Sequence, residues 1–417
     1  MSIRNLLGLC CAAAAAAASD DVYILFDMEP GEGFNFRKKC ISSRFVSFVT
    51  RLADDHPERQ FVMVVPTFRN RQGHEEYPFS AFFDMAEFQK VFPRGRVIEV
   101  ADFVQETGGT SIDSEVYFTP EWQNMDKRVC PDEKEAYTNG FYFHRPPGGD
   151  WSKHAQPSGW QVQIGGETFQ VGELQCMNGG ACMASEQRLR TLVWERIEKG
   201  ATKLFLGGYD RISPAMEDNN KRFWADRRHL LYAAPIVAEA EKFVEAMPRR
   251  DFVSIHWRRK DFKRAHADTY TSAEEAARTL FQHCEARGTH LVFMATDDTS
   301  EAADVQTALQ ALVNGRCEAD ASAAQSACPS AEVLTYPQSS AALNPMQHAL
   351  VEQLIASKGV FFLGTHHSTF SLEIHFARGG QGVDWNDADG SLTKAGKVIK
   401  LCDIEAPGGG EQCEPWW

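Results

Sequence analysis

The stretch FVSIHWRRKDF, residues 252–262, joins a short apolar run to a dense group of charges. Residues 252–255 are typical of a short buried strand, and the charged side chains begin where that strand is expected to end. In open α/β sheets, ligands bind beyond the carboxyl ends of strands. Arginine suits a phosphate ligand, because its planar guanidinium donates two parallel hydrogen bonds and stays charged. The pattern predicts an anion site around His256 and Arg258, although a solvated basic turn has the same composition.

Strands and helices are predicted to alternate on both sides of this stretch. On the C-terminal side we expect strands at 291–295, 332–334 and 360–363, and helices at 272–286, 301–313, 345–357 and 370–378. On the N-terminal side we expect strands at 22–28, 60–66, 96–100 and 203–207, and helices at 34–54, 185–199 and 219–247. This alternation is typical of doubly wound, mainly parallel sheets. We therefore predict two Rossmann-like α/β domains, residues 19–248 and 249–417, which face each other across a cleft that holds the chemistry.

Two segments interrupt the alternation. Residues 113–180 carry scattered Gly, Pro, Tyr and Trp, and we expect them to be irregular and to contact an acceptor. Residues 78–92 hold five phenylalanines, which are interpreted as a packing segment.

Composition and charge limit the class of protein. A chain of 417 residues that is 43% hydrophobic and 24% charged is an ordinary globular protein, long enough for two domains. The net charge of −14 argues against non-specific binding of nucleic acid and against docking on anionic membranes. Arg4 and the apolar run that ends near Ala18 predict a secretory signal peptide at residues 1–18. No later segment has the length of a transmembrane helix, so we expect no membrane span.

Cysteine usage agrees with an oxidising compartment. Of the 11 cysteines, two fall in the predicted signal peptide and nine follow it, several of them in loop-like contexts. Cys317 and Cys328 bracket an Ala/Ser-rich loop, and Cys402 and Cys413 bracket a Gly-rich tail, so each pair is a candidate disulfide. The odd count leaves a free thiol, for which Cys40 or Cys284 is the candidate. The spacings do not match a zinc module.

A glycine-framed acid precedes the first long helix. In the turn PGEGFN, residues 30–35, Glu32 lies between Gly31 and Gly33, and Asn35 enters the helix behind it. Glycines let the backbone approach a ligand closely, and the helix N-terminus favours an anion. Glu32 is a candidate general base, and Asn35 is a candidate hydrogen-bond donor to a phosphate group. The alternative is a turn acid stabilised by the helix dipole.

Two further predicted strands end in polar residues. The acids and hydroxyl of residues 296–298 fit a ribose, a base edge or a metal, or they cap the next helix. After residue 364, Ser368 and Thr369 either cap a helix or bind phosphate at its positive end. His366 and His367 are candidates for acid–base chemistry, with a structural or surface role as the alternative for at least one.

In this order, the motifs resemble those of the GDP-fucose protein O-fucosyltransferases, and most of all the branch that modifies thrombospondin type 1 repeats. The pieces that carry the resemblance are residues 23–27, 30–35, 80–84, 256–262, 295–297, 352–370 and 401–414. The likeness spans about residues 22–417 and is poor in the middle region, about 110–190. Glu352-Gln353 stands where the family has Asp-Gln, and the extra methylene changes the reach of that acid.

The resemblance implies a GT-B fold and an inverting, metal-independent transfer of fucose from GDP-fucose. It assigns Glu32 as the base that takes the proton of an acceptor Ser or Thr, and Arg258 as the group that holds the diphosphate. It implies donor-binding positions at Gly31, Glu32, Gly33, Phe34, Asn35, His256, Trp257, Arg258, Glu352, Ser368, Thr369 and Phe370.

The resemblance also implies partners and a compartment. We expect GDP-fucose as donor substrate with no cofactor, folded disulfide-bonded repeats as acceptors, a monomeric enzyme, and the lumen of the endoplasmic reticulum, with the Golgi as the alternative. Three other functions stay open: the same chemistry on EGF-like repeats, the same chemistry on glycans, and a non-catalytic protein that binds a nucleotide sugar.

Overall fold

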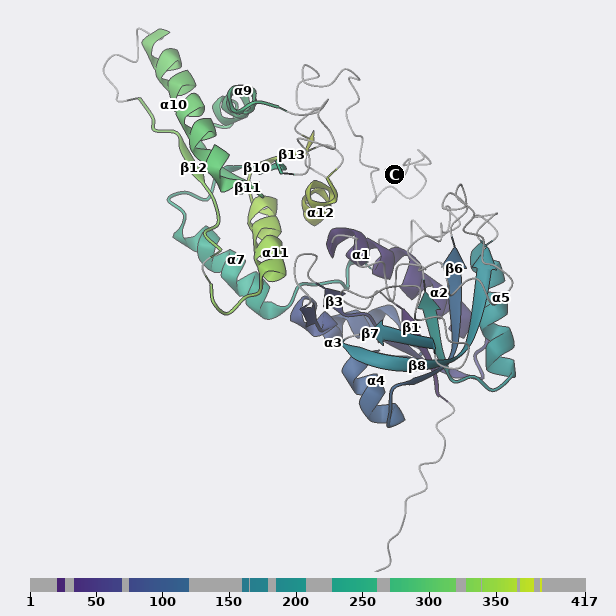
Figure 1. The fold of residues 1–417 in the computed structure, drawn as a ribbon. Coiled ribbons are helices and arrows are strands. Elements are labelled where there is room, and N and C mark those ends of the chain that lie inside the picture. The colour runs from purple at the N-terminus through teal and green to yellow at the C-terminus, as the bar shows by residue number, and fades with distance from the viewer. Residues whose placement is uncertain are drawn as a thin grey trace, which may run out of the picture. The chain divides into compact units, whose positions relative to one another are not determined.

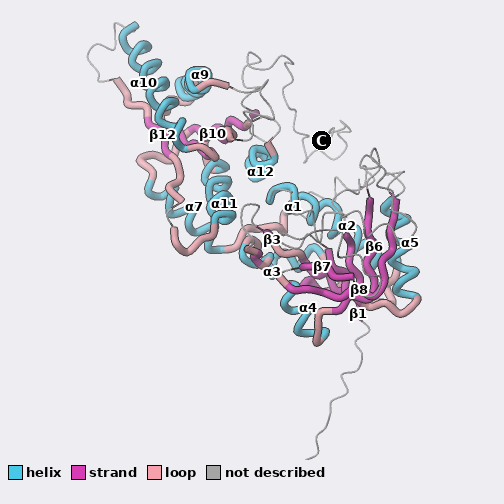
Figure 2. Tube along the Cα trace, viewed as in Figure 1, coloured by secondary structure: helices cyan, strands magenta, loops and turns pink. Residues whose placement is uncertain are grey.

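The structure is a computed structural model. It describes residues 21–26, 34–69, 75–119, 160–164, 166–178, 185–207, 227–260, 271–319, 328–338, 340–365, 368–378 and 383–384. Contacts divide the chain into two compact units. The first unit holds Met1–Glu32, Cys40–Phe79 and Met85–Leu230, and the second holds Gly33–Lys39, Ser80–Asp84 and Leu231–Trp417. Figure 1 labels many of the elements of both units, and Figure 2 colours helices cyan and strands magenta.

The first unit is built on a seven-stranded sheet of order β5-β2-β1-β9-β6-β8-β7. Its strands are β1 (Asp21–Phe26), β2 (Gln60–Val65), β5 (Arg96–Glu99), β6 (Ser111–Thr119), β7 (Trp160–Ile164), β8 (Glu167–Asn178) and β9 (Lys203–Gly207). Neighbours pair in parallel except β7, which is antiparallel to β8. The helices are α2 (Val46–Asp55), α3 (Met85–Phe88), α4 (Val100–Thr107) and α5 (Ser185–Glu198), with a π-helical turn, η1 (Ile41–Phe45), before α2.

Apolar residues hold this sheet to its helices on both faces. On one face, Tyr23 and Leu25 of β1 share a buried cluster with Phe103 of α4. Phe26 of β1 stacks on Phe45 of η1 with ring centroids 4.7 Å apart. The short strands β3 (Phe68–Arg69) and β4 (Glu76–Tyr77) form a separate antiparallel pair. The phenylalanines of the segment 78–92 are buried, as a packing segment requires.

The expectation that residues 113–180 are irregular is wrong for the parts that the structure describes. Three strands, β6, β7 and β8, run through this region. The first half of β6 is mostly polar, and Asp113 within it accepts hydrogen bonds from the backbone nitrogens of Thr202 and Lys203 at 2.8 and 2.9 Å. Asp113 makes β6 polar in sequence, because its carboxylate connects β6 to the start of β9. The backbone of β6 nevertheless pairs regularly with β8 and β9.

The helix expected at 219–247 is also shorter than predicted. Among the described residues it is α7 (Ala234–Ala246), with Pro235 in its first turn, where proline is favoured. Residues 228–233 before it are not helical, and Tyr232 among them forms an isolated bridge with Phe83.

The second unit is built on a five-stranded sheet of order β12-β11-β10-β13-β14, in which every pair is parallel. Its strands are β10 (Val253–Trp257), β11 (Leu291–Thr296), β12 (Glu332–Leu334), β13 (Phe361–Gly364) and β14 (Val383–Asp384). Its helices are α7, α9 (Ala273–Glu285), α10 (Ala302–Ala319), α11 (Pro345–Ser357) and α12 (Thr369–Ala377), together with most of α1 (Phe34–Cys40).

Side-chain alternation along β10 separates the two faces of this sheet. Val253, Ile255 and Trp257 pack into a buried cluster with residues of α9 and α10. Ser254 points to the opposite face, where its hydroxyl donates to the carbonyl of Ala356 on α11 at 2.6 Å. Helices therefore cover both faces of the sheet, which is the doubly wound arrangement that the alternation of elements predicts (Figure 1).

The boundary between the units falls between Leu230 and Leu231, earlier in the chain than the expected division at residues 248 and 249. The reason is that α7 packs against α11, and Phe243 of α7 meets Tyr336 of the second unit with ring centroids 5.6 Å apart. Residues Gly33–Lys39 also belong to the second unit, although they come from the N-terminal part of the chain.

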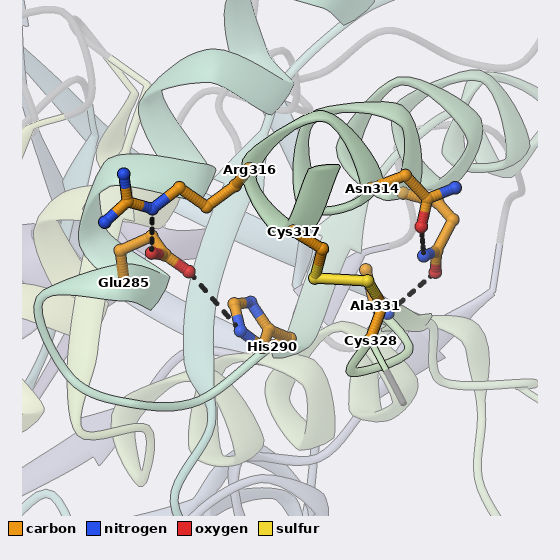
Figure 3. Close-up of a disulfide and its surroundings, with 8 residues drawn as sticks. Glu285, His290, Asn314, Arg316, Cys317, Cys328 and Ala331 are labelled. Carbon is orange, nitrogen blue, oxygen red and sulfur yellow. Dashed lines mark hydrogen bonds and ion pairs between the residues drawn. A yellow bond between two sulfur atoms is a disulfide. The ribbon is translucent and has the colours of Figure 1, made fainter. Parts of the chain in front are cut away.

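The predicted disulfide between Cys317 and Cys328 is present in the second unit (Figure 3). It connects the end of α10 to the segment before β12, and Gln310 of α10 accepts a hydrogen bond from the nitrogen of Ala331 at 2.8 Å beside it. Cys40 and Cys284 are buried and neither is in a disulfide, as predicted. The pair Cys402 and Cys413 and the signal peptide lie outside the described residues. Within the described ranges, no helix combines the length and the apolar composition that crossing a membrane requires.

Candidate functional site

The candidate site starts at the carboxyl ends of three adjacent strands of the second unit, β11, β10 and β13. Two threonines on the flanking strands hold the end of β10. The hydroxyl of Thr296 donates to the carbonyl of Trp257 at 2.8 Å, and the hydroxyl of Thr365 donates to the carbonyl of His256 at 2.7 Å. The end of β10 is thereby fixed on both sides before its charged residues begin.

Arg258 is the first charged residue after β10. Its backbone nitrogen donates to the Thr365 hydroxyl at 3.0 Å, and its Nε lies 3.3 Å from Oδ2 of Asp297. The same carboxylate accepts hydrogen bonds from the nitrogens of Arg259 at 2.7 Å and Lys260 at 3.3 Å. The Arg258 side chain stays 31% exposed, so a cation is held at the strand end with solvent access. This arrangement fits the anion site predicted from the sequence.

Arg259 has a different role from its neighbour. Its guanidinium lies 4.0 Å from the ring centroid of buried Trp257, donates to the carbonyl of Thr271 at 2.8 Å and forms an ion pair with Glu301. The side chains of Arg259 and Trp257 are both buried. Arg259 therefore connects the end of β10 to Thr271 and Glu301, and any contact of Trp257 with a ligand would involve its backbone.

His256 lies on β10, two residues before Arg258. It is buried, its ring stacks on Phe370 with centroids 4.3 Å apart, and its Nδ1 is 2.8 Å from the Ser371 hydroxyl. Burial and, to a smaller extent, the positive charge of Arg258 together lower the pKa of His256 to about 3. The imidazole is therefore neutral at physiological pH.

Ser371 fixes the orientation of the His256 ring. The backbone nitrogen of Thr365 donates to the Ser371 hydroxyl oxygen at 2.8 Å, and the same hydroxyl lies against His256 Nδ1. When the hydroxyl hydrogen goes to Nδ1, Nε2 carries the ring hydrogen and can donate it to a ligand. Ser371 was not among the predicted site residues, because nothing in the sequence signals that a serine inside α12 meets a histidine of β10.

Glu352 is a buried acid on α11. Gln338 donates to it at 3.3 Å, and burial raises the pKa of Glu352 to about 8, with the charge of Asp297 acting in the same direction. Gln338 adopts a positive φ of 48°, which is uncommon for a residue with a side chain and marks a constrained loop. A carboxyl group with this pKa changes its charge close to physiological pH.

The remaining predicted donor-binding residues fall into two groups. Phe34 packs on Phe82 and Phe83 with centroid distances of 5.0 and 5.8 Å, and Asn35 accepts a hydrogen bond from Gln353 at 2.9 Å. Ser368 and Thr369 stand at the start of α12, where Thr369 is exposed. The described members of the predicted set all belong to the second unit. Gly31, Glu32, Gly33, His366 and His367 lie outside the described residues.

The described residues contain no group of three or more His, Cys, Asp or Glu that could hold a metal ion. The acids after β11 have structural partners instead. Asp298 accepts a hydrogen bond from the nitrogen of Ser300 at 3.2 Å and caps the turn Thr299–Glu301, as the helix-cap alternative predicts.

Comparison with known proteins connects this arrangement to one family. Residues 23–379 match the family model described as GDP-fucose protein O-fucosyltransferase. The chain is 25% identical to GDP-fucose protein O-fucosyltransferase 2 of Homo sapiens over 404 residues, covering 87% of this chain and 84% of the relative. It is 22% identical to the protein of the same name from Caenorhabditis elegans over 392 residues, covering 84% and 82%.

Solved structures agree in fold. A crystal structure of POFUT1 in complex with GDP-fucose superposes with a TM-score of 0.57 at 16% identity, covering 88% of this chain and 97% of that chain. An unliganded form of POFUT1 superposes with a TM-score of 0.56. The GT-B type of α/β fold, the family and the enzyme class predicted from the sequence are thereby confirmed. The chain belongs to the GDP-fucose protein O-fucosyltransferase family and is a glycosyltransferase.

Proposed function

We propose that this protein transfers fucose from GDP-fucose to a Ser or Thr hydroxyl of a folded, disulfide-bonded repeat of the thrombospondin type 1 kind. The transfer inverts the configuration at the sugar and needs no metal ion or cofactor. Support for the donor comes from the family and from the strand-end cation of the second unit. Support for the acceptor comes from the relatives named O-fucosyltransferase 2 and from the branch that the sequence motifs resemble.

In the proposed reaction, the acceptor oxygen attacks C1 of fucose while the bond between C1 and the diphosphate oxygen breaks. The acceptor proton goes to the carboxylate of Glu32, and GDP leaves with the electron pair of the broken bond. Arg258 stabilises the charge that develops on the leaving diphosphate, and the Nε2 hydrogen of neutral His256 donates to the same nucleotide. The fixed cation supplies what a metal ion supplies in other enzymes that transfer groups from nucleotide diphosphates.

The observation that carries this proposal is the end of β10. Arg258 is oriented by Asp297 and Thr365, keeps part of its side chain in solvent and lies beside a histidine that is neutral by burial. Preorganised donors of this kind stabilise developing negative charge without reorganisation during the reaction.

We further propose that the enzyme works as a monomer in the lumen of the endoplasmic reticulum, with the Golgi as the alternative. The apolar N-terminal segment and the disulfide between Cys317 and Cys328 support an oxidising, secretory compartment. Nucleotide sugar and disulfide-bonded acceptors are then both available to it.

The deciding experiment offers GDP-fucose with three acceptors in parallel: a thrombospondin type 1 repeat, an EGF-like repeat and a glycan. We expect the mass of one fucose to be added to the folded thrombospondin repeat, with undiminished rate in a metal chelator and no addition to the reduced repeat. Modification of only the EGF-like repeat or only the glycan would replace the proposed acceptor. GDP-fucose binding without transfer to any acceptor would indicate a non-catalytic protein.

A variant of the proposed base tests the mechanism. Glu32→Ala should bind GDP-fucose with unchanged affinity in calorimetry and lose transfer, because the acceptor hydroxyl then has no base. Equal transfer by this variant would remove Glu32 from the mechanism. The configuration of the product linkage, read by NMR, tests inversion.

A further inference from the structure

Five side chains of the second unit form one continuous hydrogen-bonded chain that ends at Asn35. The ammonium of Lys38 contacts Glu373 at 2.9 Å and donates to the Tyr232 hydroxyl at 3.0 Å. Tyr232 contacts Oε1 of Gln353 at 3.0 Å, and Nε2 of Gln353 contacts Oδ1 of Asn35 at 2.9 Å. The chain thus connects α12, α1, the segment before α7, α11 and α1 again. Of the other four residues, Glu373, Lys38, Tyr232 and Gln353, only Gln353 belongs to a motif named in the sequence analysis, and the proposed reaction uses none of them.

Lys38 fixes the donor-to-acceptor direction of every hydrogen bond from Tyr232 to Asn35. An ammonium group donates hydrogen bonds and accepts none, so the Tyr232 oxygen is the acceptor in that contact. The Tyr232 hydrogen then goes to Gln353, which must turn its carbonyl oxygen toward the tyrosine. The other end of the Gln353 amide is the NH₂ group, and it donates to Asn35. Asn35 must therefore turn its own carbonyl toward Gln353.

The orientation of Asn35 leaves its NH₂ group for a ligand. Without outside constraints, the two ends of an Asn amide are nearly equal in shape, and either end is equally able to face a ligand. An NH₂ group attracts a phosphate oxygen, whereas a carbonyl oxygen repels it. Within the described residues, the contact with Gln353 is the one hydrogen bond of the Asn35 side chain.

Burial makes this direction difficult to reverse. The side chains of Lys38 and Glu373 are 6% and 4% exposed, and Gln353 is 2% exposed. The Lys38 ammonium also lies 4.4 Å from the ring centroid of Tyr232, which adds a cation–π contact on the same residue. Turning the Gln353 amide around would bring its NH₂ group against a hydroxyl that already accepts from Lys38, and would leave a buried donor unsatisfied.

We propose that Gln353 is a positioning residue, which acts with Tyr232, Lys38 and Glu373 to present the Asn35 NH₂ group to the diphosphate of a nucleoside diphosphate sugar. The proposal rests on the proposed function of this site and extends it to residues that do not touch the donor. Its specific consequence is that Gln353 affects recognition of the diphosphate only through Asn35.

Calorimetry with GDP and guanosine tests this consequence. Gln353→Met keeps the volume of the side chain, adds no charge and removes both hydrogen bonds. We expect it to weaken GDP binding about fivefold, the equivalent of one hydrogen bond, and to change guanosine binding less than twofold. In an Asn35→Ala background, which itself binds GDP more weakly, Gln353→Met should have less than a twofold further effect. Equal weakening of GDP and guanosine, or additive effects in the double variant, would overturn the proposal.

Gln347→Met is the matched control. Gln347 is a second buried glutamine of α11, but it donates to the carbonyl of Ala81 at 2.7 Å and accepts from the nitrogen of Asn344 at 2.9 Å, away from Asn35. The control should lower the melting temperature and keep the ratio of GDP to guanosine affinity. If Gln353→Met fails to fold, Tyr232→Phe tests the same proposal, because this substitution removes only the hydroxyl that orients Gln353. Tyr232→Phe should weaken GDP binding about threefold, and unchanged GDP affinity in it would overturn the proposal.

The two proposals fail in different ways. A wild-type protein that binds neither GDP nor GDP-fucose would contradict the proposed function itself. A wild-type protein that binds GDP while Gln353→Met binds it equally well would contradict only the role of Gln353.

Discussion

The Nε atom of Arg258 lies 3.3 Å from Oδ2 of Asp297, and Oδ1 of the same carboxylate accepts a hydrogen bond from the nitrogen of Arg259 at 2.7 Å. One acid at the end of β11 therefore orients the arginine side chain and the backbone that follows β10. The two adjacent arginines have opposite environments, since Arg258 is partly exposed and Arg259 is buried against Trp257.

This difference predicts opposite outcomes for the same substitution. Arg258→Lys should lower kcat/KM for GDP-fucose about 100-fold with little change in melting temperature. The reason is that a lysine cannot form the bidentate hydrogen bonds that a guanidinium forms with the diphosphate. Arg259→Lys should lower the melting temperature by several degrees, because it removes a stacked, hydrogen-bonded guanidinium from the core. Steady-state kinetics and thermal unfolding of both variants measure this. A destabilised Arg258→Lys with normal kcat/KM would contradict the assignment.

The raised pKa of Glu352 predicts how stability depends on pH. Its pKa is about 8 in the folded protein against an ordinary value of 4.5, so the folded state keeps a proton that the unfolded state releases between these values. The stabilisation from this proton is fully present below pH 4.5 and is lost as the pH rises through 8. Glu352→Gln, which cannot ionise, should therefore unfold at higher urea concentration than wild type at pH 8.5 and at a similar concentration at pH 4.5. Parallel stability curves for the two proteins between these pH values would show that Glu352 titrates normally.

Ser371 predicts a cost in stability at the site. Ser371→Ala removes the acceptor for the buried nitrogen of Thr365 and the hydroxyl that contacts His256 Nδ1. Leaving a buried donor unsatisfied costs about 1–3 kcal/mol, so the free energy of unfolding in denaturant should fall by this amount. Ser300→Ala serves as an exposed comparison, since its hydroxyl donates to Asp298 at the surface. A loss at Ser371 no larger than that at Ser300 would mean that the His256 network is not formed in solution.

Gly359, in the connection between α11 and β13, lies where the structure has no room for a larger side chain. A Cβ at this position would lie 2.7 Å from the Ser254 hydroxyl and 3.0 Å from the carbonyl of Phe252, closer than side chains pack. Gly359→Ala should therefore lower the free energy of unfolding by about 1–3 kcal/mol. Gly315 lies inside α10, and a Cβ there would meet no atom within 4 Å. Gly315→Ala should instead raise stability by up to about 1 kcal/mol, since alanine favours the helix. Equal effects of the two substitutions would contradict the packing of β10 against α11.

Much of the fold was predictable because it depends on local patterns. The limits of β9, β12 and α11 agree with prediction, since each is an apolar or periodic run bounded by a clear start or stop. Asn344 caps α11 by accepting from the nitrogen of Met346 at 3.0 Å, and Pro345 follows in the first turn. Strands β6 and β8 were missed because their polar residues are balanced by partners far away in the chain, such as Thr202 for Asp113.

The sequence by itself determined the alternation of strands and helices, the family, and the positions of His256 and Arg258 at the end of a strand. Hydrophobic periodicity and strand-end charges act over a few residues, so they can be read directly from the chain. Only the tertiary structure decided that Ser371 contacts His256, that the Arg259 side chain is buried with structural partners, and that Gln353 contacts Asn35. These relationships join residues up to 318 positions apart, and parallel strands bring such residues together through crossovers that no local pattern specifies.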